Sequence, residues 1–180
     1  MKTKIIAIVG PSGSGKTTMT QFIEKRFNIP AVVSYTTRKM RIGETNGVEH
    51  IFVSEKDMPY ANEMLAYTQF GGYHYWATIE QVIHHPVVTY VLDEVALLKM
   101  MERFDEQYDI IPVYVRRDNR LLQEQIDSER RFRDKNRVII EDAMYAAIID
   151  NNGNLQDFYS QIEKVIKNII TLDYVSSETR

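Results

Sequence analysis

The residues most clearly suited to chemistry lie in one short stretch near the N-terminus. Residues 10–17 read Gly-Pro-Ser-Gly-Ser-Gly-Lys-Thr and fit the pattern G-x-x-x-x-G-K-[ST] at every fixed position. An apolar run at 5–9 precedes this stretch, and apolar residues at helical spacing follow it. A strand, a glycine-rich turn and a helix in this order form the context in which backbone N–H groups bind phosphate. We call residues 10–17 the phosphate loop.

Each residue type in the phosphate loop has a part in that chemistry. Glycines let the backbone curl so that successive N–H groups point at an anion. Lys16 supplies a cation for the β- and γ-phosphates of ATP, and the hydroxyl of Thr17 suits a Mg²⁺ ligand. The alternative is a glycine-rich turn that binds no ligand. We expect ATP to contact the whole loop and the residue after it: Gly10, Pro11, Ser12, Gly13, Ser14, Gly15, Lys16, Thr17 and Thr18.

Composition restricts the class of protein further. The chain has 180 residues, of which 44% are hydrophobic and 26% charged, as in one globular domain with a buried core. A net charge of −3 gives no general attraction to nucleic acid or membranes, so neither is expected as a partner. The absence of cysteine excludes disulfides and thiol catalysis. The N-terminal run is too short for a signal peptide and no stretch reaches transmembrane length, so a cytoplasmic location is expected.

Alternating apolar and helical patterns predict the elements that position these residues. Apolar runs at 5–9, 31–33, 87–92 and 110–115 indicate buried parallel strands. Helical patterns cover 16–27, 94–104 and 118–132, a further run from about 134 to 147, and about 154–171, with 173–180 as a frayed tail. This alternation predicts a doubly wound α/β fold with a parallel sheet, whose ligands bind beyond the strand carboxyl ends.

Two segments interrupt the alternation. The first, 34–78, holds short strand-like pieces around 51–53 and 74–76, and a short helix with Ser54 as its N-cap and Asp57 three residues on. The second, 129–137, is rich in arginine.

The start of the first segment has a second set of phosphate-binding residues. Arg38 and Arg41 are three residues apart, and two threonines precede them. Guanidinium groups bind phosphate bidentately, and hydroxyl groups complete the coordination of its oxygens. The alternative is a polar loop that only faces solvent.

These motifs resemble those of guanylate kinases. Residues 34–47 read Ser-x-Thr-Thr-Arg-x-x-Arg-x-Gly-Glu-x-x-Gly, with Phe-Val-Ser at 52–54, and are similar to the GMP-binding segment of that family. The phosphate loop, a Gly-Tyr-Tyr-like piece at 71–75, a strand ending in Leu-Asp at 92–93 and the arginine-rich segment follow the family's order. The resemblance covers essentially the whole chain and is strongest through residue 54.

The resemblance implies a fold and an activity. The fold would be a P-loop NTPase-type three-layer α/β/α domain with a parallel sheet, a small mixed NMP-binding insertion and an arginine-rich lid. The single domain, 1–180, would comprise a core (1–33, 79–128 and 138–172), the insertion (34–78) and the lid (about 129–137). The activity would be transfer of the γ-phosphoryl group of ATP to GMP or dGMP with Mg²⁺, by a monomer or homodimer.

The resemblance also implies residue roles on the acceptor side. Arg38 and Arg41 would hold the acceptor phosphate, with Ser34 and Glu44 alongside, and Tyr75 matches the second tyrosine of the family's pair. The family usually has tyrosine where this chain has His50. An imidazole there could donate to phosphate or simply pack in the loop.

On the donor side, several residues have two interpretations. Asp93 ends a strand and could hold Mg²⁺ or cap the next helix, or do both. Asn152 resembles a residue beside the adenine of ATP, although Asn-Asn-Gly is equally a turn signal. Together with Lys16, lid arginines would stabilise the charge of the transferring group; otherwise they only face solvent. The lid residues assigned to this role are Arg130, Arg133 and Arg137.

The base pocket departs from the family. Its guanine-reading positions fall on Ala66, Ala77 and Val95, and Trp76 replaces a glycine. These residues cannot bond the edge of guanine, so we expect weakened base selectivity, with stacking on Tyr75 or Trp76. Other residues considered as base readers are Glu63 and Thr78. The alternatives are a kinase of another nucleotide or of a sugar phosphate, and a binding module without catalysis. Such a module has little use for an intact phosphate loop.

Overall fold

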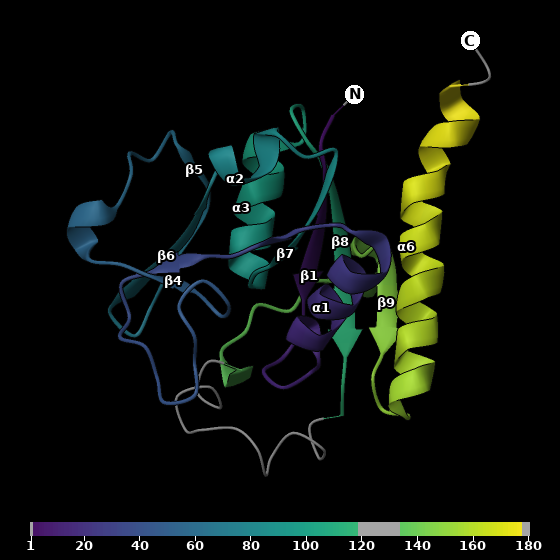
Figure 1. The fold of residues 1–180 in the computed structure, drawn as a ribbon, viewed down its shortest axis with the longest axis horizontal. Helices are drawn as coiled ribbons and strands as arrows, with labels where there is room; N and C mark the ends of the chain where they lie inside the picture. The colour runs from purple at the N-terminus through teal and green to yellow at the C-terminus, as the bar shows by residue number, and fades with distance from the viewer. Residues whose placement is uncertain (1, 119–133, 178–180) are drawn as a thin grey trace.

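The main sheet of the protein is parallel and has five strands. The computed structural model describes residues 2–118 and 134–177, with side chains through residue 171 (Figure 1). The strand order is β2-β7-β1-β8-β9, and all neighbouring pairs are parallel. The strands are β1 (Lys4–Val9), β2 (Ala31–Val32), β7 (Val87–Val91), β8 (Asp109–Arg116) and β9 (Ala147–Asp150).

Helices cover both faces of this sheet. Its strands are therefore buried on both sides. Along β1, alternate residues point to opposite faces, so Ile5 belongs to one hydrophobic cluster and Ile6 to another. The first cluster includes Leu97 of α3 (Glu94–Phe104), and the second includes Met19 of α1 (Lys16–Phe27) and Phe158 of α6 (Leu155–Ser177). These three layers confirm the predicted α/β fold with a parallel sheet.

A second, mixed sheet is formed by the segment after β2. Its order is β4-β3-β6-β5, with β3 parallel to β4 and antiparallel to β6, and β5 antiparallel to β6. The elements are β3 (Tyr35–Thr36), β4 (Ile51–Phe52), η1 (Glu55–Asp57), β5 (Met64–Phe70), β6 (Tyr73–Thr78) and α2 (Glu80–Ile83). Ser54 and Asp57 form the predicted capping box, in which the Ser54 N–H and hydroxyl donate to the Asp57 carboxylate at 2.9 and 2.8 Å.

The β5–β6 ribbon packs on the main domain through apolar residues. Leu65, Ala66 and Ala77 share a hydrophobic cluster with Leu97 and Met100 of α3. Burial of apolar surface here joins the two sheets. The ribbon that carries Tyr75, one of the residues assigned to the acceptor, therefore packs directly against the core.

Two sequence predictions at the C-terminal side were wrong. A helical run was expected from about 134 to 147, but extended chain leads through η2 (Asp142–Met144) into strand β9. The run pairs with β8, and Ile149 is completely buried. The frayed tail was expected at 173–180, but helix α6 continues to Ser177. The helix expected at 118–132 lies outside the described residues except for residue 118. Within the described ranges, no helix is long and apolar enough to cross a membrane.

Candidate active site

The candidate active site lies at the carboxyl ends of the central strands. The phosphate loop starts where β1 ends, Asp93 lies two residues after β7, and Arg117 directly follows β8. Neighbouring parallel strands end at one edge of a sheet, so their following residues come together there. The sheet order β7-β1-β8 places the phosphate loop between the other two.

Glycine is required at two positions of the phosphate loop. A Cβ on Gly10 would lie 2.6 Å from the carbonyl oxygen of Val115. Gly15 has φ +106°, in the region that favours glycine, and a Cβ there would lie 2.5 Å from Nδ2 of Asn151. The loop therefore turns sharply against β8 and the segment after β9, and delivers the chain to the N-terminus of α1.

The side chain of Lys16 lies back along the loop. Its ammonium donates to the carbonyl oxygens of Gly10 and Pro11, both at 2.7 Å. Thr17, in the first turn of α1, is exposed at the positive end of that helix. A cation and an exposed hydroxyl beside these N–H groups suit binding of a metal-bound polyphosphate.

A carboxylate also lies against the phosphate loop. Both carboxyl oxygens of Asp134 accept from the Ser12 N–H at 3.2 Å, and the Ser12 hydroxyl donates to Oδ1 at 3.2 Å. Asp134 lies within the segment assigned to the lid, so this contact links two regions whose residues are 122 positions apart in the sequence. An anion is therefore present beside the loop that is expected to receive the phosphates of ATP. The sequence analysis did not single out Asp134.

The segment after β9 supports the loop through a residue that the sequence analysis missed. Asn151 donates from Nδ2 to the carbonyl oxygen of Ser14 at 2.7 Å. The predicted ATP contact, Asn152, instead accepts from the Asp118 N–H at 2.7 Å and donates to the Asp150 carboxylate at 2.9 Å. The sequence Asn-Asn contained the signal, but nothing in it indicated which amide faces the loop. An ATP contact by Asn152 stays a prediction.

Asp93 caps helix α3. Its Oδ1 accepts from the Ala96 N–H at 2.8 Å, as one of the two sequence interpretations predicted. Oδ2 has no hydrogen bond with any residue that the structure describes, so one oxygen remains for a metal or its water. The described residues contain no cluster of three or more histidine or acidic ligands. One carboxylate and one hydroxyl fit Mg²⁺, which takes most of its other ligands from water and substrate phosphates.

In the loop between β3 and β4, Arg38 and Glu44 form a buried ion pair. The Arg38 guanidinium donates to both oxygens of Glu44, at 2.9 and 3.0 Å, and to the Lys39 carbonyl oxygen at 2.7 Å. The two side chains are 6% and 11% exposed. Glu44 also accepts from the Arg41 N–H at 2.8 Å, so it folds the loop between the two arginines.

The pKa values of this pair shift in the direction that strengthens it. Burial lowers the pKa of Arg38, but the hydrogen bonds and charge of Glu44 outweigh it and the pKa is raised overall. Burial raises the pKa of Glu44, and the hydrogen bonds from Arg38 and the Arg41 backbone lower it more, so the pKa ends below its usual value. Both groups are therefore charged at neutral pH.

The other predicted acceptor residues have contacts of their own. The Ser34 hydroxyl donates to the Tyr90 hydroxyl at 3.3 Å, and burial raises the pKa of Tyr90 to about 12. The rings of Tyr75 and His50 meet edge to face at a centroid distance of 5.6 Å, and the charge of Tyr75 contributes to the Arg38 pKa. The structure thus brings Tyr75 and His50 together near Arg38, whereas Ser34 contacts Tyr90 of β7, and the roles of all four residues stay predictions.

Of the assigned lid arginines, Arg137 lies within the described residues. Its guanidinium binds the carboxylate of Glu94, at 3.2 Å from Nε to Oε2 and through a second bond from Nη2 to Oε1. Glu94 is buried at the start of α3, next to Asp93. Arg130 and Arg133 lie outside the described residues. The sequence analysis missed Glu94, whose partner is 43 residues away along the chain.

A family model described as Guanylate kinase matches residues 2–169. The chain belongs to the guanylate kinase family. Its members are ATP-dependent phosphotransferases, so the enzyme class predicted from the sequence is confirmed.

Relatives and a solved structure agree over most of the chain. A guanylate kinase of Protochlamydia amoebophila is 28% identical over 188 residues, covering 96% of this chain and 92% of its own. One of Lactobacillus acidophilus is 29% identical over 194 residues, covering 97% and 91%. The crystal structure of guanylate kinase from Anaplasma phagocytophilum matches with a TM-score of 0.66 at 19% identity, covering 96% of this chain and 87% of that chain, and shows the same fold.

The three positions that match the guanine-reading residues of the guanylate kinase family, and that are apolar in this chain, differ in burial. Ala66 and Ala77 are 7% and 0% exposed and face each other across β5 and β6, whereas Val95 of α3 is 38% exposed. Trp76 is buried, and its ring stacks on the ring of Tyr35 with a distance of 5.6 Å between the centroids. The expectation that Trp76 stacks on a base was therefore wrong.

The replacement base readers considered from the sequence stay predictions. The Glu63 carboxylate accepts from the Tyr60 N–H at 2.9 Å through one of its oxygens. The backbone N–H of Thr78 donates to Gln81 at 2.9 Å at the end of β6.

Proposed function

We propose that the protein transfers the γ-phosphoryl group of ATP to a nucleoside monophosphate, with GMP and dGMP as the first acceptors to test. The observation that carries this proposal is the presence of two separate groups of residues suited to binding phosphate. One is the phosphate loop at the carboxyl end of β1, and the other is the cluster around the buried Arg38–Glu44 pair. A phosphotransferase between two phosphorylated molecules needs both.

On the donor side, the loop N–H groups and Lys16 bind the β- and γ-phosphates. Thr17 and the Oδ2 oxygen of Asp93 would hold Mg²⁺, which when bound neutralises charge on the phosphate oxygens. Lys16 exchanges the carbonyl oxygens of Gly10 and Pro11 for phosphate oxygens, which requires only a change of side-chain rotamer.

On the acceptor side, Glu44 orients Arg38 and holds the backbone of Arg41. Three donated hydrogen bonds from Arg38 to Glu44 and Lys39 leave two of the five guanidinium N–H groups for other partners. The acceptor phosphate would accept hydrogen bonds from these two N–H groups and from Arg41, Ser34 and His50. The hydroxyl of Tyr75 would donate to the same phosphate.

Transfer then depends on position and charge neutralisation, without a covalent intermediate on the protein. Arg137, with Arg130 and Arg133, is assigned to the charge that develops on the transferring group. Arg137 would reach it by exchanging Glu94 for phosphate oxygens. Exclusion of water from the site would protect ATP from hydrolysis.

The test is ADP production from ATP and Mg²⁺ with each of GMP, dGMP, AMP, CMP, UMP and ribose 5-phosphate. We expect nucleotide-dependent ADP formation that disappears without acceptor, and a matching nucleoside diphosphate by chromatography. ADP formation with the sugar phosphate but with no nucleotide would overturn the nucleotide assignment. The absence of turnover with every acceptor would support a binding module instead.

A further inference from the structure

Two arginines follow each other where β8 ends, and their surroundings differ. Arg116, the last residue of β8, forms an ion pair with Asp142 at 2.8 Å. Arg117 extends instead toward the phosphate loop, where its Nη1 lies 3.5 Å from the carbonyl oxygen of Gly13. Arg117 therefore places a positive charge beside the loop that is proposed to bind ATP.

The backbone that carries Arg117 is held on both sides. The carbonyl oxygen of Arg116 accepts from the Asn151 N–H at 2.9 Å, and the Asp118 N–H donates to Oδ1 of Asn152 at 2.7 Å. The side chain of Asn151 also binds a carbonyl oxygen of the phosphate loop at 2.7 Å. The segment after β9 thus fixes the start of the Arg117 side chain relative to the loop.

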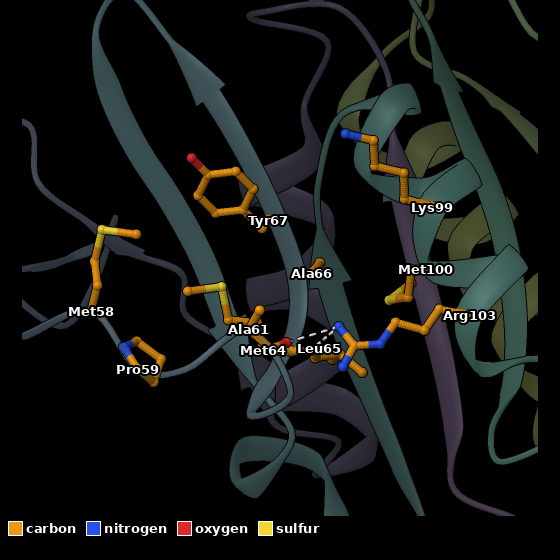
Figure 2. Close-up of a pocket in the computed structure, with 10 residues that line it drawn as sticks. All are labelled: Met58, Pro59, Ala61, Met64, Leu65, Ala66, Tyr67, Lys99, Met100 and Arg103. Atoms are coloured by element: carbon orange, nitrogen blue, oxygen red, sulfur yellow. Dashed lines mark hydrogen bonds between the residues drawn. The ribbon is translucent and has the colours of Figure 1, made fainter.

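The guanidinium of Arg117 has few partners for its N–H groups. Nε is buried without a hydrogen bond, and no carboxylate within the described part of the chain pairs with Arg117. Arg103, which lines the pocket between β5 and α3, gives the contrast, since its guanidinium donates to the carbonyl oxygens of Ala61 and Met64 at 3.0 and 3.2 Å (Figure 2). A buried donor without a partner costs stability, because it loses its hydration and gains no hydrogen bond. Such a donor beside a binding loop indicates a ligand that supplies the acceptor.

The charge of Arg117 indicates which ligand that is. The loop beside it offers backbone N–H groups and Lys16 to phosphate oxygens. A guanidinium binds phosphate oxygens through charge-assisted hydrogen bonds, whereas stacking on a base would leave Nε without an acceptor. A phosphate group therefore accounts for both the charge and the unpaired N–H group.

We propose that Arg117 binds the phosphates of ATP from the β8 side of the phosphate loop. Its contact with Gly13 is long for a hydrogen bond, so the exchange of this carbonyl oxygen for a phosphate oxygen costs little. Arg117 then adds to the charge neutralisation that Lys16 provides. This inference rests on the proposed function, since it takes ATP as the ligand of the loop.

The experiment is calorimetric titration of the full chain with ATP and with inorganic tripolyphosphate, in the presence of Mg²⁺ and without an acceptor. Arg117→Met removes every N–H group of the side chain and should weaken both ligands by the same factor, about 10- to 100-fold. Arg117→Lys keeps the charge without the planar fork and should recover part of the loss. Arg116→Met is the matched control and should bind both ligands as wild type does, because its partner Asp142 is exposed and the pair is a surface ion pair.

Thermal unfolding without ligand gives a readout that separates binding from support of the loop. If Arg117 only supported the loop, Arg117→Met would lower the Tm. Because wild type carries an unpaired buried donor, its removal should instead raise the Tm of the unliganded protein by about 2–4 °C. Saturating ATP should reverse this order, since wild type gains more stability from binding.

Several outcomes would overturn the proposal. They are equal affinity of wild type and Arg117→Met for ATP, a loss confined to ATP with tripolyphosphate unaffected, a lower Tm of unliganded Arg117→Met, and a wild type that binds ATP but not tripolyphosphate. Failure of wild type to bind either ligand would contradict the phosphate loop as a nucleotide site and this proposal with it. Because the readout is binding, it is separate from turnover. A chain that binds ATP through Arg117 but forms no ADP with any acceptor would contradict the proposed transfer and leave this phosphate contact in place.

Discussion

The carboxylate of Glu44 offers a sharp test of the acceptor side. Glu44→Gln keeps the shape of the side chain and removes its negative charge. One amide oxygen remains to accept from Arg38 or from the Arg41 backbone, while the amide nitrogen faces a guanidinium that is 6% exposed. The variant therefore leaves a buried cation without its counter-charge.

The expected loss in the free energy of unfolding follows from the burial of the Arg38–Glu44 pair. Removing one partner of a fully buried ion pair costs about 3–5 kcal/mol. Glu44 is 11% exposed and glutamine keeps one hydrogen bond, so we expect a loss of about 2–3 kcal/mol in the free energy of unfolding. If Arg38 loses its orientation, its contact with the acceptor phosphate, worth about 1.5–3 kcal/mol, is lost too, which raises the acceptor KM about 10- to 100-fold.

The assay is steady-state kinetics with GMP varied at saturating ATP, and the reverse, alongside thermal unfolding. The ATP KM should change less than about twofold, because Glu44 lies in the loop between β3 and β4 of the second sheet. Glu49→Gln is the matched control in the same loop. Its exposed carboxylate accepts from the Thr45 N–H at 2.7 Å and contacts neither arginine in a hydrogen bond that the structure records, so a small effect is expected.

The pH dependence of stability gives an independent check. The pKa of Glu44 is lowered on folding, so its contribution to stability is present above the ordinary value of 4.5 and is lost as pH falls through the lowered pKa. The difference in unfolding free energy between wild type and Glu44→Gln should be constant above about pH 5.5 and shrink below about pH 4.5. An unchanged acceptor KM in a folded Glu44→Gln enzyme, or a difference that grows on acidification, would refute the reasoning.

Three further variants test other parts of the site. Lys16→Ala should lower kcat about 100-fold or more while thermal unfolding stays near wild type, since the side chain lies on the loop surface; near-normal turnover would contradict the assignment of the phosphate loop. Arg41→Met should raise the acceptor KM about 10- to 100-fold with ATP affinity unchanged, and the reverse pattern would move Arg41 to the donor side. Asp134→Asn should bind ATP about three- to tenfold more tightly by calorimetry, because it removes an anion beside the phosphates; weaker binding would show that Asp134 does not compete with ATP.

Several parts of the site could be predicted from short stretches of sequence. The phosphate loop follows from glycines, lysine and threonine at set spacings between an apolar strand and a helix. The caps by Ser54 and Asp93 follow from residues three positions apart. Interactions of this kind join groups that are close along the chain, so neighbouring residues suffice to specify them.

Strand β9 shows where such reasoning fails. The apolar run at 147–149 is short, and a short apolar run has no period that separates strand from helix. The edge of β8 supplies the hydrogen bonds that make this run a strand, and those partners lie more than 30 residues earlier in the chain.

The pairings between distant residues depended on the fold in the same way. Glu94 with Arg137, Ser12 with Asp134 and Ser14 with Asn151 each join segments that are at least 43 residues apart. No pattern in the sequence links them, because a charged or amide side chain can take many partners on the surface. Packing of α3, the phosphate loop and the segments around β9 at one sheet edge selects the partner for each. Local spacing thus specified the groups that are proposed to bind phosphate. The convergence of strand ends at one edge of the sheet specified which residues hold those groups in place.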